Sequence, residues 1–285
     1  MRDPTRTPRR FAGFDLGAPL IMGIVNVTPD SFSDGGEFAR ADAAIAHGLR
    51  LRDEGADILD VGGESTRPGS APVSADEELA RIRPVIQALA DAGAVVSVDT
   101  RRADVMREAL ACGARIVNDV TALSFEPDSL DVVASSGASV VLMHMQGDPA
   151  TMQLAPHYDD APREVADYLA ARVAACRSAG IPDERIAVDP GIGFGKTTQH
   201  NLQLLASVDR LRALGVAVVV GLSRKGFIAK LSRGEGVKDR VAGSVAGALA
   251  AVARGADIVR VHDVAATRQA LAVWQAIEAA APPRA

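Results

Sequence analysis

Residues 57–92, DILDVGGESTRPGSAPVSADEELARIRPVIQALADA, contain one unit of a pattern that repeats along this 285-residue chain. A short apolar run, Asp57–Val61, ends in a polar, Gly-rich segment, and an Ala-rich amphipathic stretch, Ser74–Ala92, follows it. The run is apolar on both faces rather than alternating, which is typical of a parallel strand covered by helices. The unit therefore predicts a strand, a loop and a helix that returns to a parallel neighbour.

The same unit recurs from end to end. Helical stretches such as Thr197–Leu214 separate the apolar runs, and Gly-Ala or Ala-Gly pairs precede several runs, where Gly permits the left-handed backbone of a helix C-cap. The other predicted strands are Leu20–Val27, Val95–Val98, Ile116–Val117, Ser139–Met143, Ile186–Val188, Val216–Val220 and Ile258–Val261. Eight such units favour an α/β fold, a (β/α)8 TIM barrel in a single domain over residues 16–285, with an open doubly wound sheet as the alternative.

Composition excludes several functional classes. The net charge of −5 and the dispersed basic residues predict no nucleic-acid partner. No apolar run is long enough for a membrane helix, so we expect no membrane partner and a cytoplasmic location. Residues 1–15 are Arg-rich with no apolar segment behind them, which indicates a flexible N-terminal tail rather than a secretory signal. Cys112 and Cys176 fit no motif and are expected to be free thiols.

Polar side chains follow almost every predicted strand. Active sites of (β/α)8 barrels lie at the C-terminal ends of the strands, so these side chains are expected to converge on one cavity. They are Asn26, Asp99, Asn118, Asp119, His144, Asp189, Lys225, Arg260 and His262, together with the loops 28–36 and 62–69.

Three other enzyme classes are disfavoured by their motifs. The segment GIGFGKT, residues 191–197, is close to a nucleotide-binding P-loop, but Pro190 stands where that motif needs its first glycine. A dinucleotide-binding dehydrogenase would need GxGxxG after an early strand, and none occurs there. A metal hydrolase would need several His or carboxylate residues at ligand spacing, and His144, His157 and His262 have none.

Seven motifs occur in order: NVTPDSFSDGG, GGESTRPG, VDT, ND, DPGIGFGK, GLSRK and RVHD. Over residues 20–265 they closely resemble the dihydropteroate synthase family, (β/α)8-barrel transferases of folate biosynthesis that sulfonamides inhibit. The resemblance implies that 6-hydroxymethyl-7,8-dihydropterin diphosphate loses pyrophosphate, with Mg2+ helping, before the amine of 4-aminobenzoate attacks the exocyclic methylene to give 7,8-dihydropteroate. It also implies a homodimer.

The resemblance implies a pterin pocket at the strand ends. A buried carboxylate can accept two adjacent N–H groups of the pterin edge, which the resemblance gives to Asp189, assisted by the Asn118 amide. A thioether and an aromatic ring would sandwich the ring faces. The implied pterin-binding residues are Asp99, Asn118, Asp189, Lys225, Met143, Phe194 and Gly221.

The resemblance also implies a diphosphate site. The first and eighth predicted strands are neighbours in a closed barrel, so Asn26, Arg260 and His262 would form one anion site. Mg2+ keeps much of its water and takes few protein ligands, and Asn26 is the one expected here. The implied diphosphate-binding residues are Asn26, Thr66, Arg67, Arg260 and His262.

The loops 28–36 and 62–69 are long and rich in Gly and Pro, as active-site lids often are. By resemblance they complete the second substrate's pocket, in which Phe32 and Pro68 pack on the 4-aminobenzoate ring and Ser223 meets its carboxylate. Asp34 would stabilise the cationic methylene that departure of the diphosphate leaves. The implied catalytic residues are Asp34, Arg67 and Lys225.

Two alternatives would use the same barrel. A pterin-binding methyltransferase-type module would keep the pterin pocket without the intact SFSDGG and STRPG loops. A catalytically silent paralogue would have degraded loops or missing phosphate ligands. Because both loops and the ligands are intact, the synthase is favoured. Residues 145–162 form a polar excursion for which the sequence indicates no role.

Overall fold

A computed structural model describes residues 9–28, 37–65, 73–148 and 151–280, apart from the side chains of residues 37–39, and every structural statement below concerns these ranges. The strands are β1 (Arg10–Phe11), β2 (Phe14–Asp15), β3 (Leu20–Asn26), β4 (Ile58–Gly62), β5 (Val96–Asp99), β6 (Ile116–Asp119), β7 (Ser139–Met143), β8 (Ile186–Asp189), β9 (Ala217–Val220) and β10 (Ile258–Val261). The α-helices are α1 (Glu37–Asp53), α2 (Ala75–Asp91), α3 (Ala103–Ala111), α4 (Ser129–Ser136), α5 (Ala161–Ser178), α6 (Thr198–Ala206), α7 (Val208–Arg212), α8 (Gly226–Leu231), α9 (Val241–Ala253) and α10 (Val264–Ala280). Two short 3-10 helices are η2 (Asp183–Arg185) and η3 (Val237–Asp239).

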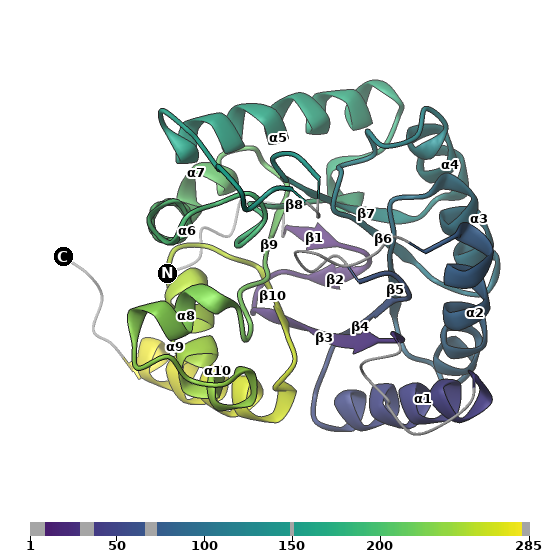
Figure 1. Ribbon diagram of the computed structural model, residues 1–285, viewed down its shortest axis with the longest axis horizontal. Coiled ribbons are helices and arrows are strands. Elements are labelled where there is room, and N and C mark those ends of the chain that lie inside the picture. The colour runs from purple at the N-terminus through teal and green to yellow at the C-terminus, as the bar shows by residue number, and fades with distance from the viewer. Residues whose placement is uncertain (1–8, 29–36, 66–72, 149–150, 281–285) are drawn as a thin grey trace.

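The strands β3 to β10 close into a barrel in the order β10-β3-β4-β5-β6-β7-β8-β9. All their pairings are parallel, and the helices form a ring around them (Figure 1). The predicted (β/α)8 barrel is confirmed. The single helix predicted over Thr197–Leu214 is instead two, α6 and α7, because the backbone leaves helical geometry at Ser207 (φ −121°, ψ 29°).

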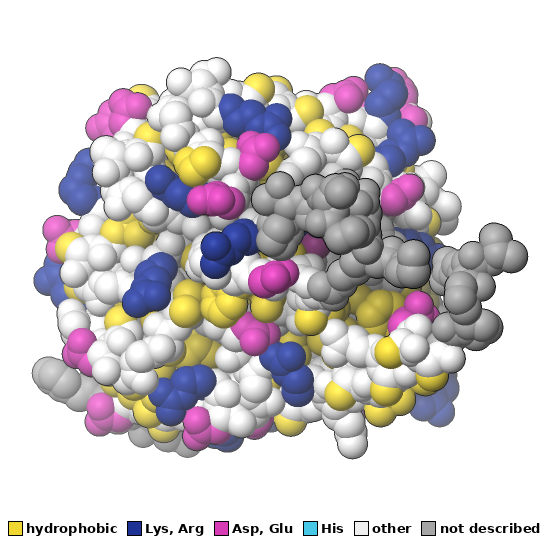
Figure 2. Space-filling view, turned by 180° about the vertical axis from the view of Figure 1, so that it is seen from behind, with side chains coloured by type: hydrophobic (Ala, Val, Ile, Leu, Met, Phe, Trp, Pro, Cys, Tyr) yellow, Lys and Arg dark blue, Asp and Glu magenta, His cyan; other side chains and the backbone are white. Residues whose placement is uncertain are grey.

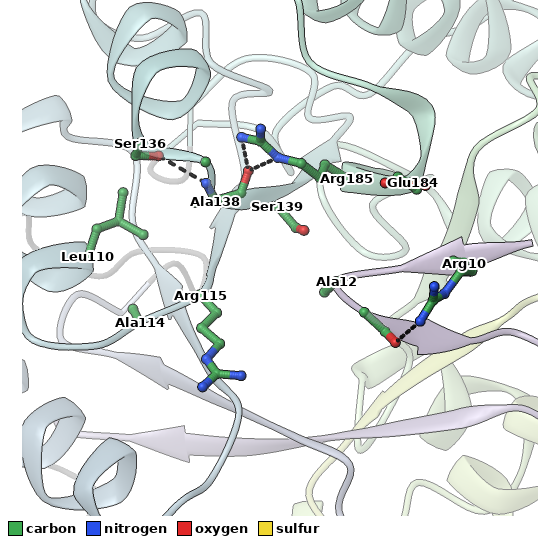
Figure 3. A pocket seen from close by; sticks show the side chains of 12 residues that line it. Arg10, Ala12, Leu110, Ala114, Arg115, Ser136, Ala138, Ser139, Glu184 and Arg185 are labelled. Atoms are coloured by element: carbon green, nitrogen blue, oxygen red, sulfur yellow. Dashed lines mark hydrogen bonds between the residues drawn. The ribbon is translucent and has the colours of Figure 1, made fainter.

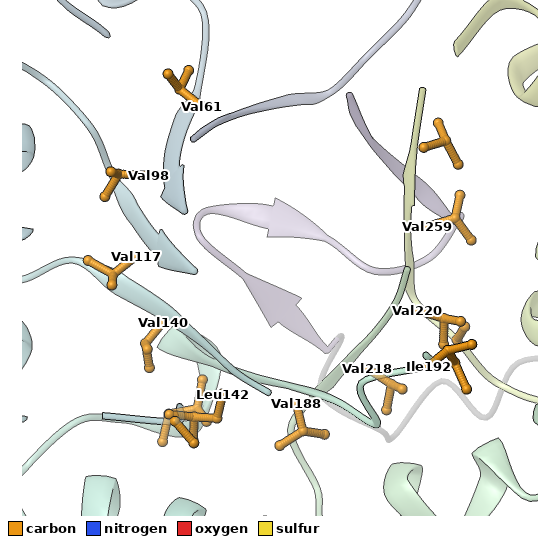
Figure 4. Close-up of a cluster of buried hydrophobic side chains, with 14 of the residues drawn as sticks. Val61, Val98, Val117, Val140, Leu142, Val188, Ile192, Val218, Val220 and Val259 are labelled. Carbon is orange, nitrogen blue, oxygen red and sulfur yellow. The ribbon is translucent and has the colours of Figure 1, made fainter. Parts of the chain in front are cut away.

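The two faces of the barrel wall have different compositions. Successive side chains of a strand point to opposite sides, and the outward ones lie beneath the helices and are apolar, apart from Asp119 at the end of β6 (Figure 4). The inward ones are apolar only near the N-terminal ends of the strands, where Met22, Ile58, Ile116 and Val141 form a separate buried cluster. Nearer the C-terminal ends the inward positions become polar, so the barrel has one apolar end and one polar mouth.

A short antiparallel hairpin, β1 and β2, lies at the apolar end. Phe11 is fully buried among the inward side chains, and Arg9 donates to both carboxylate oxygens of Asp257 at 2.8 and 3.0 Å. The structure therefore differs from the flexible tail predicted for residues 1–15: residues 9–15 pack against the barrel, because Phe11 fills its open apolar end. Residues 1–8 lie outside the described ranges.

Charged and apolar side chains are mixed on the outer surface of the described residues. Basic and acidic side chains are interspersed over the face seen in Figure 2, without a continuous basic patch. No described helix has the length and apolar character that crossing a membrane requires. Cys112 and Cys176 are both free thiols, as predicted.

Candidate active site

A buried ion-pair network spans the polar mouth of the barrel. Arg260 of β10 donates through Nε to Asp60 Oδ2 of β4 at 2.6 Å and through Nη2 to Asp99 Oδ2 of β5 at 2.8 Å. The Nδ2 of Asn118, on β6, donates to the same Asp60 oxygen at 3.0 Å. Because β3 separates β10 from β4, the guanidinium reaches past a neighbouring strand and fixes these side chains relative to one another.

Asp60 is a residue of the site that sequence reasoning missed. It lies in the middle of β4, it is fully buried, and its Oδ1 has no hydrogen-bond partner among the described residues. The available signal was an aspartate inside the apolar run Asp57–Val61, because a carboxylate at an inward strand position must be paired. By accepting hydrogen bonds from both, Asp60 fixes the side chains of Arg260 and Asn118 relative to each other.

One cation cannot fully neutralise two buried carboxylates, and the protonation of the network reflects this. Burial raises the pKa of Asp99 to about 7; Arg260 opposes the shift and the charge of Asp60 adds to it. Burial also raises the pKa of Asp189, against the effect of Lys225. In water-free surroundings such carboxylates are stabilised by N–H donors, so the mouth is suited to a ligand that presents a polar edge with several N–H groups.

Asp189, at the end of β8, and Lys225, in the loop after β9, form the part of the mouth next to these two strands. Asp189 Oδ1 accepts the backbone N–H of Gly191 at 2.7 Å, and each carboxylate oxygen has two lone pairs, so both can still accept from a ligand. The ammonium of Lys225 donates to Ile192 O and lies 4.6 Å from the centroid of the Phe194 ring. Burial lowers the pKa of Lys225 to about 8, which Asp189 opposes.

Gly221 keeps the space between Asp189 and Arg260 open. A Cβ at this position would lie 3.6 Å from Asp189 Oδ2 and 3.6 Å from Arg260 Cβ. Any larger side chain would extend into the mouth between the two charged groups. Gly221, a predicted pocket residue, therefore lies between two charged groups of the mouth.

Ser223 and His262 join the loops that follow β9 and β10. Ser223 Oγ accepts the backbone N–H of His262 at 3.1 Å and lies 3.1 Å from His262 Nδ1. Arg224, between Ser223 and Lys225, has a left-handed φ of 59° and forms an ion pair with Asp263, with Nε 3.0 Å from Oδ2. A strained backbone of this kind persists only where the surroundings hold it, and here it directs both neighbours of Arg224 towards the mouth.

The structure brings most of the predicted residues together and differs from the prediction in one respect. Arg260, expected beside Asn26 and His262 as part of a separate anion site, is bonded to the carboxylates of the network. One arginine thus belongs to both predicted subsites. The residues that the structure places at the mouth are Asn26, Asp99, Asn118, Met143, Asp189, Phe194, Gly221, Ser223, Lys225, Arg260 and His262. Phe32, Asp34, Thr66, Arg67 and Pro68 lie outside the described residues.

A magnesium ion could take only a few ligands from the described residues. No group of three or more His, Cys, Asp or Glu side chains that could hold a metal occurs among them. Asn26, half-buried at the end of β3, offers one amide oxygen, a hard ligand of the kind Mg2+ prefers. This donor set fits an ion that obtains its remaining ligands from water and a substrate diphosphate.

A separate hollow of about 420 Å³ lies at the opposite end of the barrel, beside the hairpin (Figure 3). Its wall includes Arg10, Arg115, Glu184 and Arg185. Arg185 donates to Ala138 O and Arg10 donates to Gly13 O, so two of these cations already bind backbone. None of the predicted site residues lines this hollow, and it is distinct from the candidate site.

Comparison with known proteins gives one consistent result. Residues 22–262 match the family described as "Pterin binding enzyme". The chain is 51% identical to dihydropteroate synthase of Neisseria meningitidis serogroup B, over 93% of this chain and 95% of that protein. It is similar to the Xanthomonas albilineans dihydropteroate synthase solved with 4-aminobenzoic acid (TM-score 0.91, 54% identity, 97% of this chain and 100% of that one). The structure of that enzyme with 7,8-dihydropteroate matches with a TM-score of 0.87 and 51% identity, over 97% of this chain and 100% of the other.

Proposed function

The chain belongs to the dihydropteroate synthases, a family of pterin-binding transferases, and on this premise we propose that it joins 6-hydroxymethyl-7,8-dihydropterin diphosphate to 4-aminobenzoate. The observation that carries the proposal is the array of the half-buried Asp99 and the buried Asn118 and Asp189 at the barrel mouth. The relatives solved with 4-aminobenzoic acid and with 7,8-dihydropteroate support the choice of substrates.

The pterin edge would bind in the mouth. Its adjacent N–H groups can donate to the two oxygens of Asp189, while Asn118 supplies one further acceptor and Asp99 bonds another part of the ring. Lys225 would donate to the ring carbonyl or a ring nitrogen. Met143 and Phe194 would contact the two faces of the ring, which suits a thioether and an aromatic group.

The diphosphate would lie towards Asn26 and His262, with one guanidinium edge of Arg260 directed at it. Arg260 remains charged, because burial is outweighed by the carboxylates of Asp60 and Asp99, which raise its pKa. Thr66 and Arg67 would add further contacts to the leaving group. Mg2+, held in part by Asn26, would supply additional positive charge to the departing pyrophosphate.

We propose that the diphosphate departs before the amine attacks. The C–O bond at the exocyclic methylene breaks, its electron pair leaves with pyrophosphate, and Asp34 stabilises the remaining cation. The neutral amine of 4-aminobenzoate, held by Phe32, Pro68 and Ser223, then forms the C–N bond and loses one proton to water. No strong base is needed, because an aniline-type amine attacks in its neutral form.

An assay for pyrophosphate release tests the activity. Release should require both pterin diphosphate and 4-aminobenzoate, with 7,8-dihydropteroate formed in equal amount. A chain that binds pterin but releases no pyrophosphate would be a catalytically silent paralogue, which would contradict the proposal.

The substitution Asp34→Ala tests the role of Asp34 in stabilising positive charge at the methylene. We expect turnover to fall by at least about 100-fold while pterin affinity changes little, because the charge of Asp34 matters mainly after the leaving group departs. The measurements are kcat and the equilibrium affinity for 6-hydroxymethylpterin. Equal losses in both would assign Asp34 to ground-state binding instead.

The proposed assembly is a homodimer. On α10 the apolar residues Val273 and Ile277, four positions apart and so on the same side of the helix, are 58% and 61% exposed, which would give a second copy an apolar surface to contact. Light scattering of the purified protein should give twice the mass of one chain; a monomer at micromolar concentration would contradict this part of the proposal.

A further inference from the structure

The loop that follows β8 is held by side chains along nearly its whole length. Four consecutive carbonyl groups each accept from a different side chain: Ile192 O from Lys225, Gly193 O from Gln153, Phe194 O from Lys196 and Gly195 O from Tyr158. Gln153 and Tyr158 belong to the excursion 145–162, for which the sequence indicated no role. This excursion therefore fixes the backbone that carries Phe194.

Lys196 connects the same loop to the end of β7. Its side chain is 3% exposed, and Nζ lies 2.9 Å from Phe194 O, 3.2 Å from His144 O and 3.0 Å from His144 Nδ1. An ammonium group has three N–H donors, and these three acceptors match them. Since His144 directly follows Met143, one buried amine joins the backbone beside Met143 to the backbone of Phe194.

The protonation of this pair does not break the connection. Burial and the charge of Lys196 lower the pKa of His144 to about 3, so its ring is neutral and Nδ1 is able to accept. Burial lowers the pKa of Lys196 itself to about 7. After losing a proton the amine still has two N–H groups for the two carbonyl oxygens.

Gly191 makes the close approach of the two segments possible. Its φ is +66°, in the left-handed region, and a Cβ at this position would lie 1.9 Å from His144 O. A side chain there would push the loop away from β7. The glycine and the lysine therefore act together: one permits the contact and the other fixes it.

We propose that Lys196 is a positioning residue that sets the width of the slot between Met143 and Phe194. The inference rests on the proposed function, in which these two side chains contact opposite faces of the pterin ring. A flat ring in contact on both faces needs walls about 7 Å apart, twice the distance of a carbon–carbon contact. Lys196 lies behind the slot and acts through the backbone on either side of it.

The test compares four variants of the full-length protein. Lys196→Met removes all three donors at similar length, and Lys196→Gln keeps two N–H donors. Tyr158→Phe removes one donor from the adjacent carbonyl, and Lys238→Met changes an exposed lysine as the control. The measurements are the Kd for 6-hydroxymethylpterin, KM for each substrate with the other saturating, kcat and the melting temperature.

We expect Lys196→Met to raise the pterin Kd and the pterin diphosphate KM by about tenfold, the size that loss of one or two buried hydrogen bonds gives. The KM for 4-aminobenzoate and kcat should stay within about twofold, because the ring walls act on ground-state and transition-state binding alike. Lys196→Gln should recover part of the loss, Tyr158→Phe should show a smaller rise, and Lys238→Met none.

Unchanged pterin affinity in a folded Lys196→Met variant, or equal rises in both KM values, would overturn the inference. If Lys196→Met does not fold, Lys196→Gln and Tyr158→Phe decide: both must weaken pterin binding selectively, and unchanged affinity in either would overturn it. Wild-type protein that binds no pterin would instead contradict the proposed function.

Discussion

The two ends of the barrel interior are built from the same eight strands with opposite chemistry. At one end Met22, Ile58 and Val141 pack around Phe11 in a dry cluster. At the other end Asp60 and Asp99 share the guanidinium of Arg260. A change of side chain at alternate positions is enough to convert a stabilising core into a binding site, while the outward face of each strand keeps the helices in place.

The two ends of the barrel interior also differ in what they contribute to the protein. Buried apolar side chains contribute to stability directly, whereas a buried ion pair contributes little once its desolvation is counted, and breaking one leaves an uncompensated charge. We therefore expect substitutions at the apolar end to change stability, and substitutions at the polar end to change binding.

The largest expected effect is on stability, from Phe11→Ala. Removing a fully buried phenylalanine should lower the free energy of unfolding by about 3–5 kcal/mol, as large-to-small substitutions in cores do. The pterin Kd should be unchanged. Urea unfolding measures the first quantity, and Phe125→Ala, at a phenylalanine that is 47% exposed, is the matched control. A loss of pterin affinity with normal stability would show that the two ends are not independent.

Asp189→Asn should have the next largest effect, on binding. One of the two Asp189 oxygens that would accept from the pterin edge becomes an amide NH2 group. This group would face an N–H group of the pterin, which should weaken pterin binding by about 100-fold. Stability should stay level or rise, because burial already raises the pKa of the Asp189 carboxyl. Calorimetry with 6-hydroxymethylpterin measures the affinity, with the exposed Asp209→Asn as control; unchanged affinity would disprove the ring-edge role.

The smallest expected effect is a dependence of stability on pH. Burial raises the pKa of Asp99 to about 7, above its ordinary value of 3.8. The favourable contribution of its protonated form is therefore complete below pH 3.8 and is lost as the pH rises towards 7. Urea unfolding of the ligand-free protein at pH 5.0 and 7.5 should show a decline that is reduced in Asp99→Asn. An equal decline in both proteins would assign the dependence to other groups.

The barrel was predictable from the sequence because the outward positions of its strands are apolar, apart from Asp119. Each predicted strand range overlaps an observed strand, from Leu20–Asn26 to Ile258–Val261. The hairpin was not predictable in this way, because two-residue strands carry no periodicity. Phe11 and Phe14, two aromatic residues in a polar segment, were the available signal.

The candidate site was predictable where polar residues end a strand, as Asn118 and Asp189 do. Asp60 was missed because it lies within an apolar run: its position there indicates that it must be paired, but the sequence does not indicate that its partner is Arg260, 200 residues away. The donors that hold the loop after β8 were missed for a similar reason. Gln153 and Tyr158 bind backbone carbonyl groups, and a sequence motif does not record which carbonyl a distant side chain will find.

The hairpin at the apolar end also bears on how the chain is made. Arg9 and its partner Asp257 are 248 residues apart, and β3 pairs with β10, so segments that are translated far apart in time complete the barrel together. On the ribosome, Phe11 emerges long before the strand that closes the wall around it. Until residue 257 has left the exit tunnel, a nascent chain presents an aromatic side chain and the unpaired edge of β3 to its surroundings. This protein should therefore depend on chaperones most strongly until β10 has been made and has paired with β3.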